Sequence, residues 1–374
     1  MTRPGLYVHV PFCEKKCAYC NFYSVTSLND IPEYVNAILK ELSLYNRDFS
    51  YFDTIYFGGG TPSLLSDADL SEILVHVRKT FTIAADAEIT AEINPGDADL
   101  HFLVSLRQMG VNRLNIGIQS FDEDILRFLD RRHTREQAIH SIEQARAAGF
   151  DNIGLDFMYG IPDQSLLSWK GTLSQALSFH PEHLSCYQLS LESDTPLGRR
   201  HQNNEFALPG EDEQAELFML TSDILTGAGY LHYEVSNFAR DDRCKSRHNQ
   251  KYWRHVPYLG IGPAAHSFSG QRRWWNHRSV KQYLLDLRED RRPLEASETL
   301  TLSQQRLEAS FLGLRTGEGI PLKHFSAQQE DMSPREREKV LELLVQQGLI
   351  VIQDGFLKPT RRGLAVADRL ALML

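Results

Sequence analysis

The segment Tyr7-Val-His-Val-Pro-Phe-Cys13-Glu-Lys-Lys-Cys17-Ala-Tyr-Cys20 joins a strand-like run to a polar loop that carries three cysteines. Three thiolates this close together are typical of a zinc site or of an iron–sulfur cluster. Structural zinc takes four ligands, and the loop offers no fourth cysteine or histidine, since His9 lies on the strand itself. The spacing therefore favours a four-iron cluster held by Cys13, Cys17 and Cys20, with one iron open to a ligand that is not protein.

Two further cysteines lie far from this loop. Cys186 falls within an apolar run and is expected in the core, whereas Cys244 lies in a charged segment and its role stays open. Five cysteines are an odd number, and the chain shows neither an apolar signal segment nor a run of about 18 apolar residues. We therefore expect a cytoplasmic protein without a disulfide framework.

The composition is that of a soluble globular protein of about two domains. The 374 residues are 42% hydrophobic and 24% charged, and 40 basic residues against 49 acidic ones give a net charge of −9. A general electrostatic attraction to nucleic acid or to an anionic membrane is therefore not expected.

The first half of the chain alternates strand-like and helical patterns. Strands are predicted at residues 6–10, 54–57, 88–93, 113–119, 152–158 and 183–189. Helices are predicted between them at residues 31–45, 67–81, 99–109, 135–148 and 165–179, with Gly110 and Gly149 as helix stops. Repeated βα units predict an α/β fold with a parallel sheet, either open or closed into a barrel.

Polar or glycine residues recur where these predicted strands end. The segment Gly58-Gly-Gly-Thr-Pro62 follows the second strand, Glu92 and Gln119 end the third and fourth, Asp156 lies in the fifth, and Ser190 follows the sixth. The carboxyl ends of barrel strands converge on one face, where active sites lie. We therefore expect these positions to meet with the cysteine loop around one pocket.

The second half is less regular. Residues 199–209 are interpreted as a linker or long loop, residues 211–228 as a helix, and residues 230–276 as an irregular stretch rich in His, Trp, Tyr and Arg. The tail predicts two helices, a hairpin over 349–359 and a last helix over 361–372, an order typical of a small winged-helix-like domain. Its charges nearly cancel, which favours a packing or protein-contact role over nucleic-acid binding. The expected domains are 1–200, an α+β extension over 201–298, and 299–374.

The cysteine loop and the glycine segment together resemble the radical SAM superfamily. The match is closer to the oxygen-independent coproporphyrinogen III oxidase (HemN) family, whose motifs recur here along nearly the whole chain: residues 7–13, 57–63, 92–95, 115–121, 155–162 and 259–262. The resemblance implies a partial (β/α)6 barrel. It also implies a [4Fe–4S] cluster on the three cysteines, with S-adenosylmethionine bound at the fourth iron.

The same resemblance implies which residues hold S-adenosylmethionine: Tyr7, Tyr19, Gly59, Gly60, Thr61, Glu92, Gln119, Arg131 and Asp156. The glycines would let the backbone approach the methionyl amino group, because a side chain there would block it. Glu92 would pair with that amine or hold the ribose, and Gln119 and Asp156 would bind ribose hydroxyls. Arg131 would neutralise the carboxylate, since a guanidinium matches a planar carboxylate.

Two departures separate this chain from the oxidases of the family. The oxidases carry a fourth cysteine two residues after the third, where this chain has Phe22. They also carry a longer segment before the cysteine loop, which here begins at residue 13. Both departures favour the heme chaperone branch of the family.

A third feature favours the same branch. His248-Asn249-Gln-Lys-Tyr252-Trp253 fits the HNxxYW motif that the resemblance associates with heme binding. Histidine is a good axial ligand of heme iron, and aromatic side chains pack on porphyrins.

The residues leave several heme contacts open. Cys244 and His266 remain alternative axial ligands to His248. Lys251, Arg272 and Arg273 are candidates for pairing with heme propionates, although surface basic residues often have no such purpose.

The expected function is thus that of a heme chaperone that binds a [4Fe–4S] cluster, S-adenosylmethionine and heme. It would pass heme to acceptor apoproteins, among them membrane respiratory enzymes, and so reach the membrane only through a partner. An electron donor and a homodimer are further expected partners. The alternatives are an oxygen-independent coproporphyrinogen III oxidase, which converts two propionates to vinyls, and another radical SAM activity.

Overall fold

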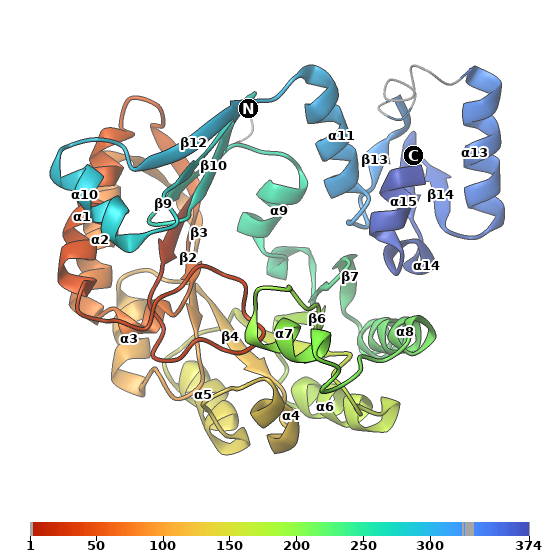
Figure 1. Ribbon diagram of the computed structural model, residues 1–374, viewed down its shortest axis with the longest axis horizontal. Helices are drawn as coiled ribbons and strands as arrows, with labels where there is room; N and C mark the ends of the chain where they lie inside the picture. The colour runs from red at the N-terminus through yellow and green to blue at the C-terminus, as the bar shows by residue number, and fades with distance from the viewer. Residues whose placement is uncertain (1–2, 324, 326–332, 374) are drawn as a thin grey trace.

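Six parallel strands, in the order of the sequence, form the centre of one curved sheet (Figure 1). The computed structural model describes residues 3–323, 325 and 333–373. Within them, β1 and β6 are not paired with each other, so the barrel is open, as the predicted partial (β/α)6 barrel requires. The strands are β1 Gly5–Val10, β2 Tyr51–Gly59, β3 Thr82–Ile93, β4 Arg113–Gln119, β5 Ile153–Tyr159 and β6 His183–Gln188.

The helices that connect these strands lie along the outside of the sheet (Figure 1). Local signals fix their ends: Ser66 and Thr134 each cap a helix in a capping box, and Gly110 and Gly149 follow helix ends at φ +96° and +86°, which confirms the predicted stops. The helices are α1 Ile31–Leu44, α2 Asp67–Thr80, α3 Leu100–Gln108, α4 Glu123–Phe128, α5 Arg135–Ala147 and α6 Leu166–Ser178.

The two faces of the sheet have different chemistry. In β1, Leu6, Val8 and Val10 are completely buried within the main apolar core that the helices cover. Tyr7 and His9 alternate with them and face the barrel interior. The same alternation in the other strands gives the interior a polar lining, on which the site is built.

The sheet continues at both edges beyond the barrel. Beyond β1 lie β9 Tyr258–Ile261, β10 His266–Ser269, β11 Arg272–Asn276 and β12 Leu294–Thr299, while β8 Asn237–Ala239 and β7 Leu231–Glu234 follow β6. The prediction that residues 230–276 are irregular was therefore wrong. The strands within residues 230–276 are three to five residues long, too short for a periodic pattern, and they form because they pair with strands already in place.

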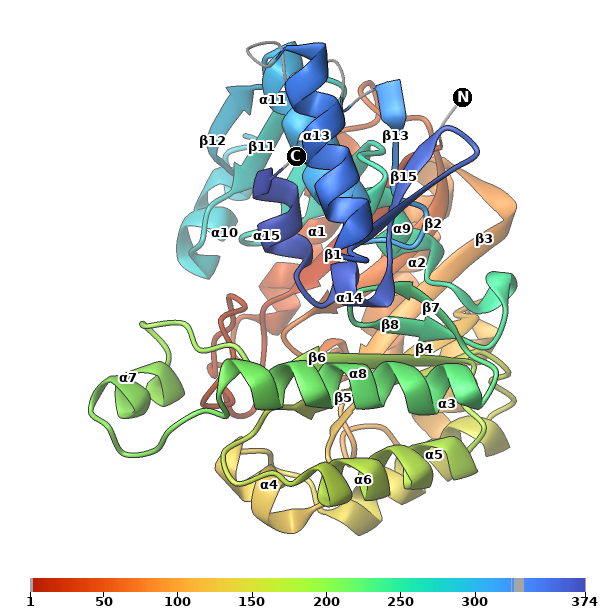
Figure 2. The same cartoon turned by 90° about the vertical axis from the view of Figure 1, so that its right-hand side faces the viewer.

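The predicted linker over 199–209 was wrong in part. Helix α7 Pro196–Gln202 occupies its first residues, and α8 Glu211–Gly227 follows. Thr195 caps α7 by accepting a hydrogen bond from the Gly198 N–H, and Pro196 suits the first helical position. The Leu197 N–H donates to the Ala18 carbonyl at 2.9 Å, so α7 lies against the cysteine loop (Figure 2).

The C-terminal segment forms a domain with its own apolar core, set beside the barrel (Figure 1). The predicted order of helices and hairpin is confirmed, except that the helix predicted over 361–372 is divided into two. Asp354 and Gly355 form the turn at φ +54° and +77°. Its elements are α11 Leu302–Gly313, β13 Ile320–Pro321, α13 Pro334–Gln346, β14 Ile350–Gln353, β15 Phe356–Pro359, α14 Arg361–Leu364 and α15 Ala367–Met373. Over the described ranges, no helix has the length and apolarity to cross a membrane.

Candidate functional site

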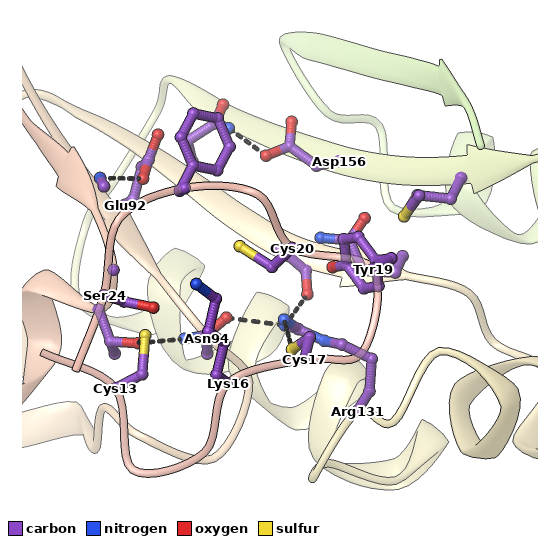
Figure 3. Close-up of a pocket in the computed structure, with 18 of the residues that line it drawn as sticks. Cys13, Lys16, Cys17, Tyr19, Cys20, Ser24, Glu92, Asn94, Arg131 and Asp156 are labelled. Carbon is purple, nitrogen blue, oxygen red and sulfur yellow. Dashed lines mark hydrogen bonds between the residues drawn. The ribbon is translucent and has the colours of Figure 1, made fainter. Parts of the chain in front are cut away.

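A cavity of about 590 Å³ lies at the carboxyl ends of the barrel strands. It brings together nearly all the residues that the sequence predicted for the cluster and for S-adenosylmethionine (Figure 3). Its lining includes Cys13, Cys17, Cys20, Tyr19, Gly59, Gly60, Thr61, Glu92, Gln119, Arg131, Asp156 and Ser190.

Tyr7 is the predicted residue that lies elsewhere. It is half-buried and lies outside this lining, where its hydroxyl donates to His9 Nδ1 at 3.0 Å. His9 Nε2 in turn donates to the Tyr23 carbonyl at 2.8 Å. The pair thus ties β1 to the residues that follow the cysteine loop.

The glycine segment holds the cysteine loop against the sheet. The Gly60 N–H donates to the Val10 carbonyl and the Thr61 N–H to the Phe12 carbonyl, each at 2.8 Å. A Cβ on Gly60 would lie 2.6 Å from the Phe12 oxygen, and Gly59 has φ +107°. Only glycine permits this approach and this backbone conformation at low cost.

A chain of hydrogen bonds links two of the thiols across the cavity floor. Thr61 Oγ1 donates to Cys13 Sγ at 3.6 Å and accepts from Asn94 Nδ2 at 3.0 Å. Arg131 donates to Asn94 Oδ1 at 2.7 Å and to Cys17 Sγ at 3.4 Å, yet its Nε is buried without a partner. The guanidinium charge therefore lies beside a cluster thiol, with one donor still to be satisfied.

The three thiols share one wall of the cavity, but they are not drawn together as ligands. Among the described residues no three His, Cys, Asp or Glu side chains are already grouped as metal ligands. Burial raises the pKa of the Cys20 thiol, so its thiolate needs a cation such as iron. The donor set of three sulfurs fits a [4Fe–4S] cluster with one open iron, provided that the loop closes around it.

Two half-buried carboxylates, Glu92 and Asp156, face the cysteines from the sheet (Figure 3). Glu92 accepts from the Tyr56 hydroxyl at 2.7 Å and from the Gly59 N–H at 3.2 Å, and burial together with the nearby Asp156 raises its pKa to about 7. Asp156 accepts from Asn115 Nδ2, burial raises its pKa, and its Oδ1 is buried without a partner. This wall of the cavity therefore offers carboxylate oxygens to a cation and to a hydroxyl donor, and S-adenosylmethionine carries both groups.

Sequence reasoning missed the residues that orient these groups, namely Tyr56, Asn94 and Asn115. A signal was present in β4, where polar or glycine residues alternate with Leu114, Ile116 and Ile118. Such alternation in a strand between two covered faces indicates a polar interior. Gln119 ends this strand at φ +63°, a conformation that is uncommon for a residue with a side chain and that clusters at functional sites.

The histidine of the HNxxYW motif is closed to a ligand in this structure. His248 is completely buried on helix α9 Arg247–Trp253. Its Nδ1 bonds Thr54 Oγ1 at 2.8 Å and its Nε2 bonds the Tyr252 hydroxyl at 2.9 Å, so both ring nitrogens are engaged. In this conformation the ring anchors α9 to the barrel interior, and heme ligation by His248 stays a prediction.

The other members of the motif point to different places. Asn249 lines the main cavity. Trp253 borders a separate hollow of about 310 Å³ between α9 and residues 316–318, with its ring 5.7 Å from that of Tyr233. Tyr252 contacts His248 and Tyr258 rather than either opening.

Among the alternative heme contacts, the structure separates engaged side chains from open ones. Lys251 Nζ lies 2.6 Å from Asp53 Oδ1, and Arg273 pairs with Glu298 and Glu308, so neither is available to a propionate. Arg272 lies over the Trp274 ring on the outer face.

Two further candidates lie outside the main cavity. Cys244 is half-buried in a short turn, η2 Asp242–Cys244. His266 is exposed at the start of β10, and burial of part of the ring, then Arg273 and Arg278, lower its pKa.

An open (β/α)6 sheet with a three-cysteine loop after its first strand defines a radical SAM protein. The model of the Radical SAM superfamily matches residues 7–176, and that of the HemN C-terminal domain matches residues 292–366. The structure of coproporphyrinogen III oxidase (HemN) from Escherichia coli superposes with a TM-score of 0.83 at 25% identity, covering 100% of this chain and 90% of that one. Membership in the superfamily implies a [4Fe–4S] cluster and S-adenosylmethionine.

The relatives define the family more narrowly. The chain is 33% identical to the heme chaperone HemW of Bacillus subtilis, covering 96% of this chain and 95% of the relative. It is 34% identical to that of Synechocystis (91% and 84%) and 41% identical to that of Escherichia coli (70% and 69%). The chain belongs to the HemW family of radical SAM proteins.

Proposed function

We propose that this protein is a heme chaperone that binds heme and passes it to acceptor apoproteins. The observation that carries the proposal is identity of 33–34% to heme chaperones over more than nine-tenths of the chain. Phe22, 68% exposed at the cavity, supports it, because this position holds a cysteine in the oxidases that the sequence resembles.

In the proposed site, Cys13, Cys17 and Cys20 hold the cluster, and Glu92 and Asp156 accept hydrogen bonds from the amine and ribose of S-adenosylmethionine. The cluster held by Cys13, Cys17 and Cys20 would, when bound and reduced, supply an electron to S-adenosylmethionine. The chain's own residues bind and orient the cofactor, and the sheet and its helices exclude water from the cavity walls. An electron donor, a homodimer and membrane respiratory acceptors belong to the same proposal.

The test is anaerobic reconstitution followed by heme titration and by transfer to an apo-heme protein. We expect a stable heme complex and transfer of unaltered heme. Failure to bind heme at micromolar concentrations would contradict the proposal.

Coproporphyrinogen III oxidation is the second candidate, because the HemN structure covers the whole chain. Product analysis decides between them. Conversion of coproporphyrinogen III to protoporphyrinogen IX would favour the oxidase, and its absence alongside heme transfer would favour the chaperone.

A further inference from the structure

One exposed histidine lies on the continuation of the barrel's inner face, where β10 pairs with β11. His266 lies opposite Trp275 across this pair, with ring centroids 5.6 Å apart and planes inclined by 21°. The imidazole nitrogens make no hydrogen bond with any residue that the structure describes. Stacking fixes the orientation of the ring, while the lone pair of its unprotonated nitrogen lies in the ring plane and stays open to a ligand.

This histidine lies beside the cysteine loop. Strand β9 runs parallel to β1, so the turn from β9 to β10 lies at the end of β1 that leads to Cys13. A Cβ on Gly262, in that turn, would lie 2.4 Å from the His9 carbonyl oxygen. His266 is near enough to act electrostatically on His9.

Arg278 bridges the histidine and the loop. Its Nη2 donates to the Asn21 carbonyl at 3.1 Å, next to the exposed Phe22, and its charge acts on His266. Within the described part of the chain, no carboxylate forms an ion pair with its guanidinium, in contrast to the neighbouring Arg273. Arg278 thus exposes a cation beside the cysteine loop, and Phe22, the residue after its partner Asn21, exposes an aromatic ring there.

We propose that His266, Trp275, Arg278 and Phe22 form the heme-docking surface, with His266 as the axial ligand of the iron and Arg278 facing a propionate. The proposal rests on the proposed function, since it places the heme which that function requires. Imidazole is a common axial ligand, aromatic side chains pack on porphyrin, and a guanidinium matches a carboxylate.

The position suits a chaperone better than His248 does. Ligation by His248 would break its bonds to Thr54 and Tyr252 and would need an opening for a porphyrin deep in the barrel. Heme on an exposed surface can pass directly to an acceptor.

Replacement of His266 tests the ligand. Cluster-loaded wild type, His266→Ala and His248→Ala are titrated with hemin and their axial ligation is read by electron paramagnetic resonance. The control is His140→Ala, an exposed histidine on α5. We expect His266→Ala alone to bind about tenfold more weakly or worse and to lose the histidine signature. Added imidazole should restore that signature.

Replacement of Arg278 tests the propionate contact. Arg278→Gln should weaken binding of hemin several-fold but not that of hemin dimethyl ester, which lacks the carboxylate charges. Arg272→Gln, a cation on the outer face, is the matched control. Equal loss for hemin and the ester would remove Arg278 from the proposed surface.

The outcomes separate the two proposals. If the wild type binds no hemin, the proposed chaperone function fails. If it binds hemin with a histidine signature that survives in His266→Ala, only the docking surface is wrong and the chaperone function stands.

Discussion

Glu41 is a completely buried carboxylate on α1 that joins the barrel to the extension of its sheet. Its oxygens accept from the Gly262 N–H at 2.9 Å, from Asn276 Nδ2 at 2.7 Å and from the Tyr283 hydroxyl at 2.6 Å. Burial nevertheless raises its pKa to about 7. The desolvation of the charge thus outweighs three hydrogen bonds.

A pH dependence of stability follows from this residue. The folded state holds the Glu41 proton more tightly than the unfolded state does, so its contribution to stability is present below about pH 4.5 and is lost as the pH rises to about 7. Glu92 acts in the same direction. Urea unfolding of the apoprotein at pH 5 and 8 should therefore show a smaller pH effect in Glu41→Gln than in wild type. The exposed Glu143→Gln is the control, and an unchanged pH effect in Glu41→Gln would refute the assignment.

Asp156 is predicted to bind the ribose of S-adenosylmethionine. Its Oδ1 is buried without a partner, while Asn115 already satisfies the other oxygen. Asp156→Asn should weaken S-adenosylmethionine binding about tenfold, because hydrogen bonds to charged groups are worth about 1.5–3 kcal/mol. Equilibrium dialysis measures this, with iron content unchanged and the exposed Asp86→Asn as control. Wild-type affinity in Asp156→Asn would count against the predicted ribose contact.

At the scale of elements, one loop carries all three cysteines that are predicted to bind the cluster. Cys13→Ser, Cys17→Ser and Cys20→Ser should each lose most iron and sulfide after reconstitution, because each removes one of three cluster ligands. Cys186→Ser and Cys244→Ser should retain the cluster, since these residues lie in the core and in a distant turn. Loss of the cluster in Cys244→Ser would show that the ligand set is different.

The elements also show what a sequence can predict. Strands β1 to β6 could be predicted because each carries an apolar run bounded by glycine or polar residues. The strands of the extension could not, because β8 has three residues and pairs with β6 only after the barrel exists. Helix α7 was missed although Thr195 and Pro196 carried a normal helix-start signal.

The residues of the site divide in the same way, into those that a local motif predicts and those that depend on distant partners. The cysteines and the glycine segment could be predicted because their chemistry lies in local motifs. The engagement of His248 could not, because its partner Thr54 is 194 residues away in the sequence. Burial and partners, rather than motif membership, decide which histidine is open to a ligand.

On the scale of the whole molecule, the cavity and the C-terminal domain lie apart. The domain attaches at the β7 edge, where Arg315 pairs with Glu234 and the Val235 N–H donates to the Arg315 carbonyl at 3.0 Å. The cavity lining within the described chain ends at Asn249, so this domain adds nothing to it. Among the described residues, the cavity is therefore built by the barrel and by the extension of its sheet.

The proposed function requires this protein to carry heme and not to catalyse a step of porphyrin synthesis. The most direct measurement compares two incubations of the cluster-loaded protein with reductant and S-adenosylmethionine. One incubation contains heme and an apo-heme protein, the other contains coproporphyrinogen III, and the product of each is followed. The predicted result is transfer of intact heme to the apoprotein with no protoporphyrinogen IX formed. Catalytic formation of protoporphyrinogen IX without a stable heme complex would contradict it.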